Sequence, residues 1–204
     1  MRKKNDQRRQ AILDAAYEVF RTKGFEGASM SAIKVKSGGS RATIYSYFAS
    51  KEELFVECFA LAEPYLKDIF SSLSDPTLDV ATTLRRLGER AIELMCSPEL
   101  LSARRVAIAQ AERSGVGKLF YEKIRSGQRE LVGFFADAMH QGKLLQDDPV
   151  LATLHFRALL EAELFEPCAL AARPVPPGKE DVKNAADRAV TAFLRAYAPQ
   201  GCAR

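Results

Sequence analysis

The sequence has few of the groupings that mark membrane proteins, secreted proteins or metal centres. No apolar run approaches the roughly 18 residues that cross a bilayer, and no apolar stretch follows the polar start Met-Arg-Lys-Lys-Asn-Asp-Gln. The four cysteines are scattered, form no Cys-x-x-Cys pair and are not at zinc-site spacing from the two histidines, His140 and His155. We therefore expect a cytoplasmic protein with buried free thiols, no cofactor, no metal and no membrane partner, with a redox sensor or metal site as the alternative.

Groupings typical of catalysis are also missing. Neither histidine has an acid-base or nucleophilic partner near it in the sequence, and Gly38-Gly39 lacks the spacing of a phosphate-binding loop. The sequence therefore predicts that the protein is not an enzyme. Apolar residues recur at helical spacing and no strand-like alternation of useful length occurs, so the predicted fold class is all-α.

Helical periodicity places the longer helices. A first helix is expected to pack across the following short helices and to stop at Gly24. A helix that continues past Leu54 is expected to kink at Pro64, because proline lacks a backbone donor. The expected helices cover residues 6–23, 51–73, 118–140, 149–171 and 179–197.

Residues 24–55 carry the pattern on which the functional prediction depends. Ser29, Ser40 and Ser50 each suit a helix N-cap, and the Ser-Gly-Gly sequence at 37–39 suits a tight turn. Two short helices joined by such a turn form a helix-turn-helix, which inserts its second helix into the major groove. The free face of that second helix is Arg, Thr, Tyr and Ser rather than the Glu/Lys mixture of a solvated helix. The alternative is a helical hairpin inside an ordinary core.

The charge is uneven along the chain. Residues 1–50 carry ten Lys/Arg against four Asp/Glu, a net of +6, whereas residues 51–204 carry 20 against 22, a net of −2. A basic excess beside a helical hairpin is typical of a module that binds nucleic-acid phosphates. Residues 1–9 form a basic arm that either follows the DNA backbone or is a frayed, solvated terminus. These features favour double-stranded DNA as a partner.

Two short motifs flank this region. Gly24-Phe25 closes the first predicted helix, and residues 44–54 read Ile-Tyr-Ser-Tyr-Phe-Ala-Ser-Lys-Glu-Glu-Leu. Together they resemble the TetR family of transcriptional regulators, in which a Gly-Phe/Tyr pair precedes a helix-turn-helix that closes in Ile/Leu-Tyr-x-x-Phe-x-x-Lys-x-x-Leu. The resemblance covers about the first quarter of the chain. It implies a three-helix DNA-binding domain over 1–50 and a larger helical domain for ligand binding and dimerisation over 51–204.

The sequence departs from the family pattern in and before the turn. Gly39 stands where the family usually has an apolar residue, and Lys34 and Lys36 stand where it usually has small alanines. Since Gly39 removes a side chain and adds unfolded-state entropy, we expect a less rigid recognition helix in the absence of DNA. The two lysines are either extra phosphate contacts or exposed side chains.

Seven residues are predicted to contact DNA. Arg41 is the candidate for base reading, because its guanidinium can pair bidentately with guanine, and a phosphate contact or surface ion pair is the alternative. Thr43 suits a thymine methyl, and Ser29 lies at a helix N-terminus that suits phosphate. The resemblance implies phosphate contacts for Tyr45 and Lys51. The full set is Ser29, Ser40, Arg41, Thr43, Tyr45, Tyr47 and Lys51.

The rest of the chain is predicted to pair two copies and to bind an effector. Small residues along the last two helices allow close packing into a four-helix bundle, as the resemblance also implies, although both stripes could instead serve the monomer's core. The resemblance further implies an unknown small-molecule effector in a central cavity. Its candidate lining residues, each alternatively plain core, are Phe70, Met95, Phe120, Phe134 and His155.

The predicted function is therefore a sequence-specific transcriptional regulator. The specific expectation is a homodimeric repressor that a small hydrophobic ligand releases from a palindromic operator. A helical adaptor that uses its basic N-terminal module on an acidic protein partner is the alternative. Steep salt dependence with duplex DNA and preference for one palindrome distinguish the regulator from the adaptor.

Overall fold

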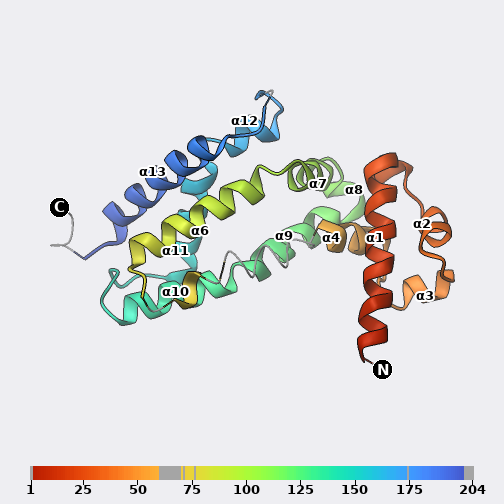
Figure 1. The fold of residues 1–204 in the computed structure, drawn as a ribbon, viewed down its shortest axis with the longest axis horizontal. Helices are drawn as coiled ribbons and strands as arrows, with labels where there is room; N and C mark the ends of the chain where they lie inside the picture. The colour runs from red at the N-terminus through yellow and green to blue at the C-terminus, as the bar shows by residue number, and fades with distance from the viewer. Residues whose placement is uncertain (1, 60–69, 71, 76, 174, 200–204) are drawn as a thin grey trace. The chain divides into compact units, whose positions relative to one another are not determined.

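The computed structural model describes residues 2–59, 70, 72–75, 77–173 and 175–199. Within these ranges every regular element is helical and no strand occurs, which confirms the all-α prediction (Figure 1). No helix in the described ranges is long and apolar enough to cross a membrane. The elements are α1 (Arg2–Gly27), α2 (Met30–Ser37), α3 (Arg41–Tyr45), α4 (Lys51–Phe59), the 3-10 helix η2 (Ser72–Ser74), α6 (Val80–Met95), α7 (Pro98–Ala109), α8 (Ala111–Ser114), α9 (Val116–Gly127), α10 (Arg129–His140), α11 (Pro149–Glu161), α12 (Phe165–Ala169) and α13 (Lys179–Tyr197).

The chain divides into two compact units. The first contains Met1–Leu61 and Ala103–Lys123, and the second contains Ala62–Ser102 and Ile124–Arg204. The predicted domain boundary after residue 50 remains a prediction.

Helix α1 organises the first unit. It packs against α2 and α4, and its apolar side is buried at Ile12, Ala16 and Phe20. The rings of Phe20 and Phe25 both meet Phe55 of α4 edge to face, with centroids 5.1 and 5.0 Å apart. Edge-to-face pairs add a directional preference to the apolar burial, so these rings fix α4 against the end of α1.

Helix α1 begins earlier than expected. It starts at Arg2 rather than near residue 6, so the described part of the basic arm is helical. Its regular backbone stops at Gly24, which has a φ of 67°, and this confirms the predicted stop. Polar side chains of its first turns contact the helix-turn-helix. Apolar periodicity does not detect such a start, because the residues that hold it are polar.

The second unit is a helical bundle built on α6, α10, α11 and α13. Helix α6 packs against α13 and α11, and α11 also packs against α10 and α13. The buried rings of Phe135, Phe156 and Phe193 lie at its centre. Gly88 lets α6 approach its neighbours, because a Cβ there would lie 3.0 Å from Leu160 Cδ2 and 3.4 Å from the Ala186 Cβ.

Two predicted helices are interrupted. The helix expected over 118–140 is divided between α9 and α10 at Gly127-Gln128, where glycine weakens the helix. The helix expected over 149–171 ends at Glu161, and a new one begins at Phe165. This restart puts Pro167 in the first turn of α12, where the missing N–H has no helical partner to lose. The kink expected at Pro64 lies outside the described residues.

Candidate nucleic-acid interface

Short-range hydrogen bonds form each helix boundary in the helix-turn-helix. The Ser29 hydroxyl accepts from the Ala32 N–H at 3.2 Å, and the Ser40 hydroxyl accepts from the Thr43 N–H at 3.0 Å. Gly38 ends α2 with a φ of 66° and donates its N–H to a carbonyl of the last turn at 3.1 Å. Both N-caps and the glycine turn are therefore confirmed.

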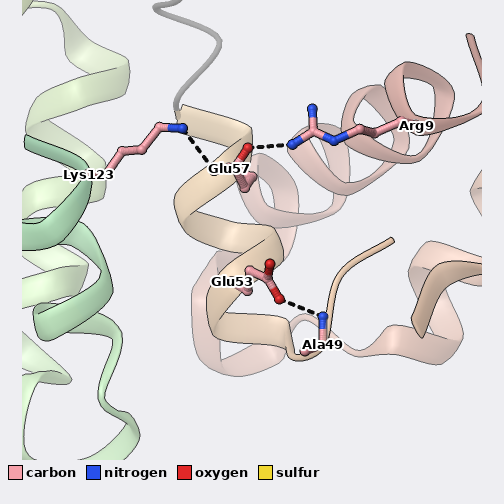
Figure 2. A network of polar contacts seen from close by, with 5 residues as sticks. All are labelled: Arg9, Ala49, Glu53, Glu57 and Lys123. Carbon is pink, nitrogen blue, oxygen red and sulfur yellow. Dashed lines mark hydrogen bonds and ion pairs between the residues drawn. The ribbon is translucent and has the colours of Figure 1, made fainter. Parts of the chain in front are cut away.

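The start of α4 is capped reciprocally. The Ser50 hydroxyl accepts from the Glu53 N–H at 3.0 Å. The Glu53 carboxylate accepts from the Ala49 N–H at 2.5 Å, as Figure 2 shows. The Glu53 N–H, which the helix leaves unsatisfied, thus receives an acceptor, and so does the N–H of the residue before the cap. The arrangement is similar to a capping box, in which the acid accepts from the N–H of the cap itself. The predicted third cap, Ser50, is therefore confirmed. These bonds fix the residue at which α4 begins.

Helix α3 has a buried side and an exposed side. Ile44 of α3 and Phe48, three residues after the helix ends, are 0% and 1% exposed, so they fix this segment to the core of the first unit. Arg41 and Tyr45 are exposed, and no hydrogen bond or ion pair within the described ranges uses the Arg41 guanidinium. Arg41 is also the first residue of α3, and the N-terminal residues of a recognition helix are those that contact base edges.

Two other predicted DNA contacts, one in α3 and one just after it, are engaged inside the protein. Thr43 is partly buried, and its hydroxyl shares a 2.7 Å hydrogen bond with the Ser40 hydroxyl. Tyr47 is also partly buried and donates its hydroxyl to the side-chain carbonyl of Asn5 on α1. The exposed part of the predicted set is thus Ser29, Ser40, Arg41 and Tyr45.

Lys51 is held by the end of α1. Its ammonium group donates to the carbonyl oxygens of Phe25 at 3.0 Å and Ala28 at 3.4 Å, and it lies 4.3 Å from the centroid of the Phe25 ring. A lysine has three donors, so these two bonds and the cation–π contact leave one N–H for a further partner. This structural role depends on carbonyl groups 26 and 23 residues away, which no local sequence pattern indicates.

Glu57 on α4 joins three helices. Its carboxylate contacts Arg9 Nη2 of α1 at 2.5 Å and Lys123 Nζ of α9 at 2.9 Å (Figure 2). Burial on its own would raise the pKa of Glu57, but the hydrogen bonds and charges of Lys123 and Arg9 outweigh it and lower that pKa. The Arg9 guanidinium also lies 5.1 Å from the centroid of the Phe48 ring. Sequence reasoning missed Glu57, whose partners lie 48 and 66 residues away.

The five candidate ligand-lining residues belong to both units. Phe70, Met95 and Phe134 are partly buried against the core of the second unit, whereas Phe120 is buried and belongs to the first unit. His155 is exposed on α11, with its Nδ1 2.6 Å from the Tyr197 hydroxyl. The ligand site therefore remains a prediction.

Three of the cysteines are buried free thiols, as expected. Cys58, Cys96 and Cys168 form no disulfide, and Cys202 lies outside the described residues. Burial, reinforced by the charges of Glu57 and Asp14, raises the pKa of Cys58 to about 12. Such a thiol is protonated at neutral pH and is a poor nucleophile.

A capped helix-turn-helix with an exposed arginine at the start of its second helix defines a helix-turn-helix DNA-binding protein. Residues 12–58 match the family model described as bacterial regulatory proteins, tetR family. Residues 82–199 match the model for the C-terminal domain of AefR-like transcriptional repressors. The chain belongs to the TetR family of transcriptional regulators, whose members bind DNA and are not enzymes.

Individual relatives agree with this assignment. A TetR-family transcriptional regulator from Mesorhizobium loti is 29% identical, with 96% of this chain and 98% of that chain covered and a TM-score of 0.80. The flavonoid-responsive regulator FrrA is 26% identical, with 96% and 100% covered and a TM-score of 0.73. The uncharacterised HTH-type regulator YfiR of Bacillus subtilis is 48% identical over 50 residues, which are 24% of this chain and 24% of that protein.

Proposed function

We propose that the protein is a homodimeric repressor that places α3 in the major groove and reads a guanine with Arg41. The single observation that carries this proposal is the exposed, unpaired Arg41 on a helix whose opposite side is buried through Ile44, with Phe48 buried just after the helix. A guanidinium in that position can donate to both acceptors on the major-groove edge of guanine. Ala42, which is exposed beside it, is small enough for close approach to the groove.

The other predicted DNA contacts differ in how many hydrogen-bond donors remain free to bind phosphate. Ser29 and Tyr45 are exposed and suit phosphate oxygens, which position the protein without selecting a sequence. Tyr47 gives its hydroxyl hydrogen to Asn5, and Lys51 has one donor left. We therefore assign these two a secondary part in phosphate binding and a primary part in holding the motif together.

The proposed dimer uses the exposed side of α11. Leu151, Leu154, His155 and Ala158 follow one another at helical spacing on that side, and the two leucines are 40% and 38% exposed. An apolar stripe of this kind is stabilised when a second copy covers it. Two copies would place two α3 helices on one duplex, and the two-fold symmetry of such a dimer requires a palindromic operator.

Leu154→Glu tests the dimer. We expect this variant to sediment as a monomer at concentrations where the wild type sediments as a dimer, because a charge would be buried in the stripe. Leu170→Glu is the matched control, since Leu170 is 72% exposed and lies after α12 rather than on α11. Dimerisation of Leu154→Glu at wild-type affinity would contradict the proposed interface.

We further propose that a small apolar effector releases the DNA. FrrA, which is named as flavonoid-responsive, aligns with nearly the whole chain, and this likeness supports an effector of small-molecule size. Phe70, Met95 and Phe134 remain the candidate contacts in the second unit. An effector that binds better to a dimer with a different separation of its α3 helices would lower the affinity for the operator by the same coupling free energy.

The function as a whole is tested by selection from a random duplex library with the wild type and with Arg41→Ala. We expect the wild type to enrich one palindrome. In the variant, the preference at one base position should weaken, with a loss of about 1–3 kcal/mol in the free energy of discrimination between bases. Lys34→Ala is the control, because Lys34 is exposed on α2 rather than α3. It should leave the preferred sequence unchanged. No enrichment by the wild type at moderate salt would contradict DNA reading and favour the adaptor.

A further inference from the structure

A side chain from α1 packs on the turn between α2 and α3. Arg8 donates from Nη1 to the Ser37 carbonyl oxygen at 3.2 Å. Gly39 lies against the same guanidinium, because a Cβ built on it would be 2.1 Å from Arg8 Nη2 and 3.3 Å from Arg8 Cζ. Real Cβ atoms do not approach other heavy atoms within 3.0 Å. Arg8 in this position and any side chain at residue 39 therefore exclude each other.

The turn does not need glycine at position 39 for its backbone. Gly38 has a φ of 66°, a left-handed conformation that favours glycine, whereas Gly39 is not among the residues with positive φ. Gly39 is therefore explained by space rather than by conformation. The Arg8 guanidinium occupies the space that a side chain at residue 39 would fill. The lower rigidity that the sequence predicts for this region remains a prediction.

Two other residues of the first turns of α1 contact the segment that follows the recognition helix. Asn5 accepts the Tyr47 hydroxyl, and Arg9 lies over the Phe48 ring. Helix α3 has only five residues, and so short a helix is not stable without contacts outside itself. The first turns of α1 supply such contacts to the segments before and after it.

We propose that Arg8 and Gly39 form a matched pair that positions α3 for base reading. Arg8 is then a positioning residue rather than a phosphate contact. The guanidinium satisfies a carbonyl at the C-terminal end of α2, where a positive charge is favourable. It also fixes the turn through which α3 is attached. This inference rests on the proposed function of α3 as the reading helix.

The test is a double-mutant cycle of Arg8→Ala, Gly39→Ala and the double variant. Gly39→Ala keeps the Arg8 charge but displaces the guanidinium, so it should have the same effect as Arg8→Ala. The probes are the duplex enriched by the wild type and a scrambled duplex of the same length. We expect each single variant to bind the enriched duplex about 3- to 10-fold more weakly, which is the effect of one lost hydrogen bond. The double variant should bind no more weakly than either single variant, because both changes remove the same contact.

Two DNA-binding readouts and one control variant separate positioning from other roles. Binding to the scrambled duplex and the slope of log affinity against log salt should match the wild type, because no phosphate contact is removed. Gly27→Ala is the control, since a Cβ there would only touch the Lys23 Cβ at an ordinary 3.6 Å. A salt slope reduced by about one unit in Arg8→Ala, or a Gly39→Ala variant that binds like the wild type, overturns the inference.

A measurement without DNA keeps this inference separate from the proposed function. Amide hydrogen exchange of a peptide covering residues 40–48 should be faster in both single variants than in the wild type and in Gly27→Ala, and no faster in the double variant than in either single variant. If the wild type enriches no duplex, the proposed function fails and the exchange result decides whether the pair fixes α3. Unchanged exchange in both single variants overturns the pair in every case.

Discussion

Replacing Glu57 with glutamine tests whether its carboxylate holds α4 to α1 and α9. Glutamine keeps the size of the side chain and one acceptor oxygen but removes the charge that faces both Arg9 and Lys123. We expect the variant to fold and to be less stable than the wild type. The loss should be electrostatic, because the shape and apolar contacts of the side chain are unchanged.

The magnitude follows from the exposure of the three groups. The Glu57 side chain is 22% exposed, but its partners Arg9 and Lys123 are 42% and 45% exposed, so solvent screens both pairs. Exposed pairs contribute up to about 1 kcal/mol each, and two pairs that share one partly buried carboxylate should contribute about 1–2 kcal/mol together. For a chain of this length that corresponds to a fall in Tm of about 2–8 °C.

The assay is thermal unfolding at low and high salt, with Glu53→Gln as the matched control. Glu53 lies one turn earlier on α4 and accepts only a backbone N–H, which an amide oxygen can also accept. The Glu57→Gln deficit should shrink in 1 M salt, where the screening length is about 3 Å, while the control changes little. A Glu57→Gln variant no less stable than the control, or a deficit independent of salt, would refute this reasoning.

The difference in stability between the wild type and Glu57→Gln should also depend on pH. Because the folded-state pKa of Glu57 is lowered, its stabilising effect is present above the unfolded value of about 4.3 and is lost as the pH falls through the folded value. The stability difference between wild type and Glu57→Gln should therefore be constant from about pH 5 upward and decline in more acidic solution. A difference that grows below pH 4 would contradict the assigned sign.

Three further predictions concern packing and thiols. Lys51→Met should lower stability by about 1–2 kcal/mol in urea unfolding, because two carbonyls lose a charged donor. Gly88→Val should cost about 1–3 kcal/mol by the same assay, since even a Cβ would lie 3.0 Å from Leu160 Cδ2, and an unchanged midpoint would contradict the close helix approach. Cys58 and Cys96, whose pKa values burial raises to about 12, should react with Ellman's reagent only after unfolding.

Local signals in the sequence predicted the helix-turn-helix well. A cap depends on a side chain and an amide three residues apart, so Ser29 and Ser40 could be assigned from their own neighbourhood. A left-handed turn residue is also a local property, and glycine at position 38 indicates it directly. The same local logic identified the buried side of α3 from the spacing of Ile44 and Phe48.

The interrupted helices show where periodicity alone is insufficient. Apolar spacing continues from α9 into α10 and from α11 into α12, so it predicted one helix in each case. The breaks come from single residues that oppose a helix, a glycine at 127 and a proline at 167, which leave the apolar pattern intact. A periodic pattern reports which side of a segment is buried, and it reports less well whether the segment is continuous.

The polar contacts of the candidate interface required the structure because they join residues far apart in the sequence. Arg8 meets Ser37 across 29 residues, and Tyr47 meets Asn5 across 42. These contacts explain why residue 39 is glycine: the Arg8 guanidinium, from a distant part of the sequence, occupies the space of a side chain. A small residue at a turn was interpreted as a source of flexibility because glycine lacks a side chain of its own. The space that it leaves can equally be filled by a long side chain from another helix, and we propose that Gly39 then stabilises the position of α3 rather than loosening it.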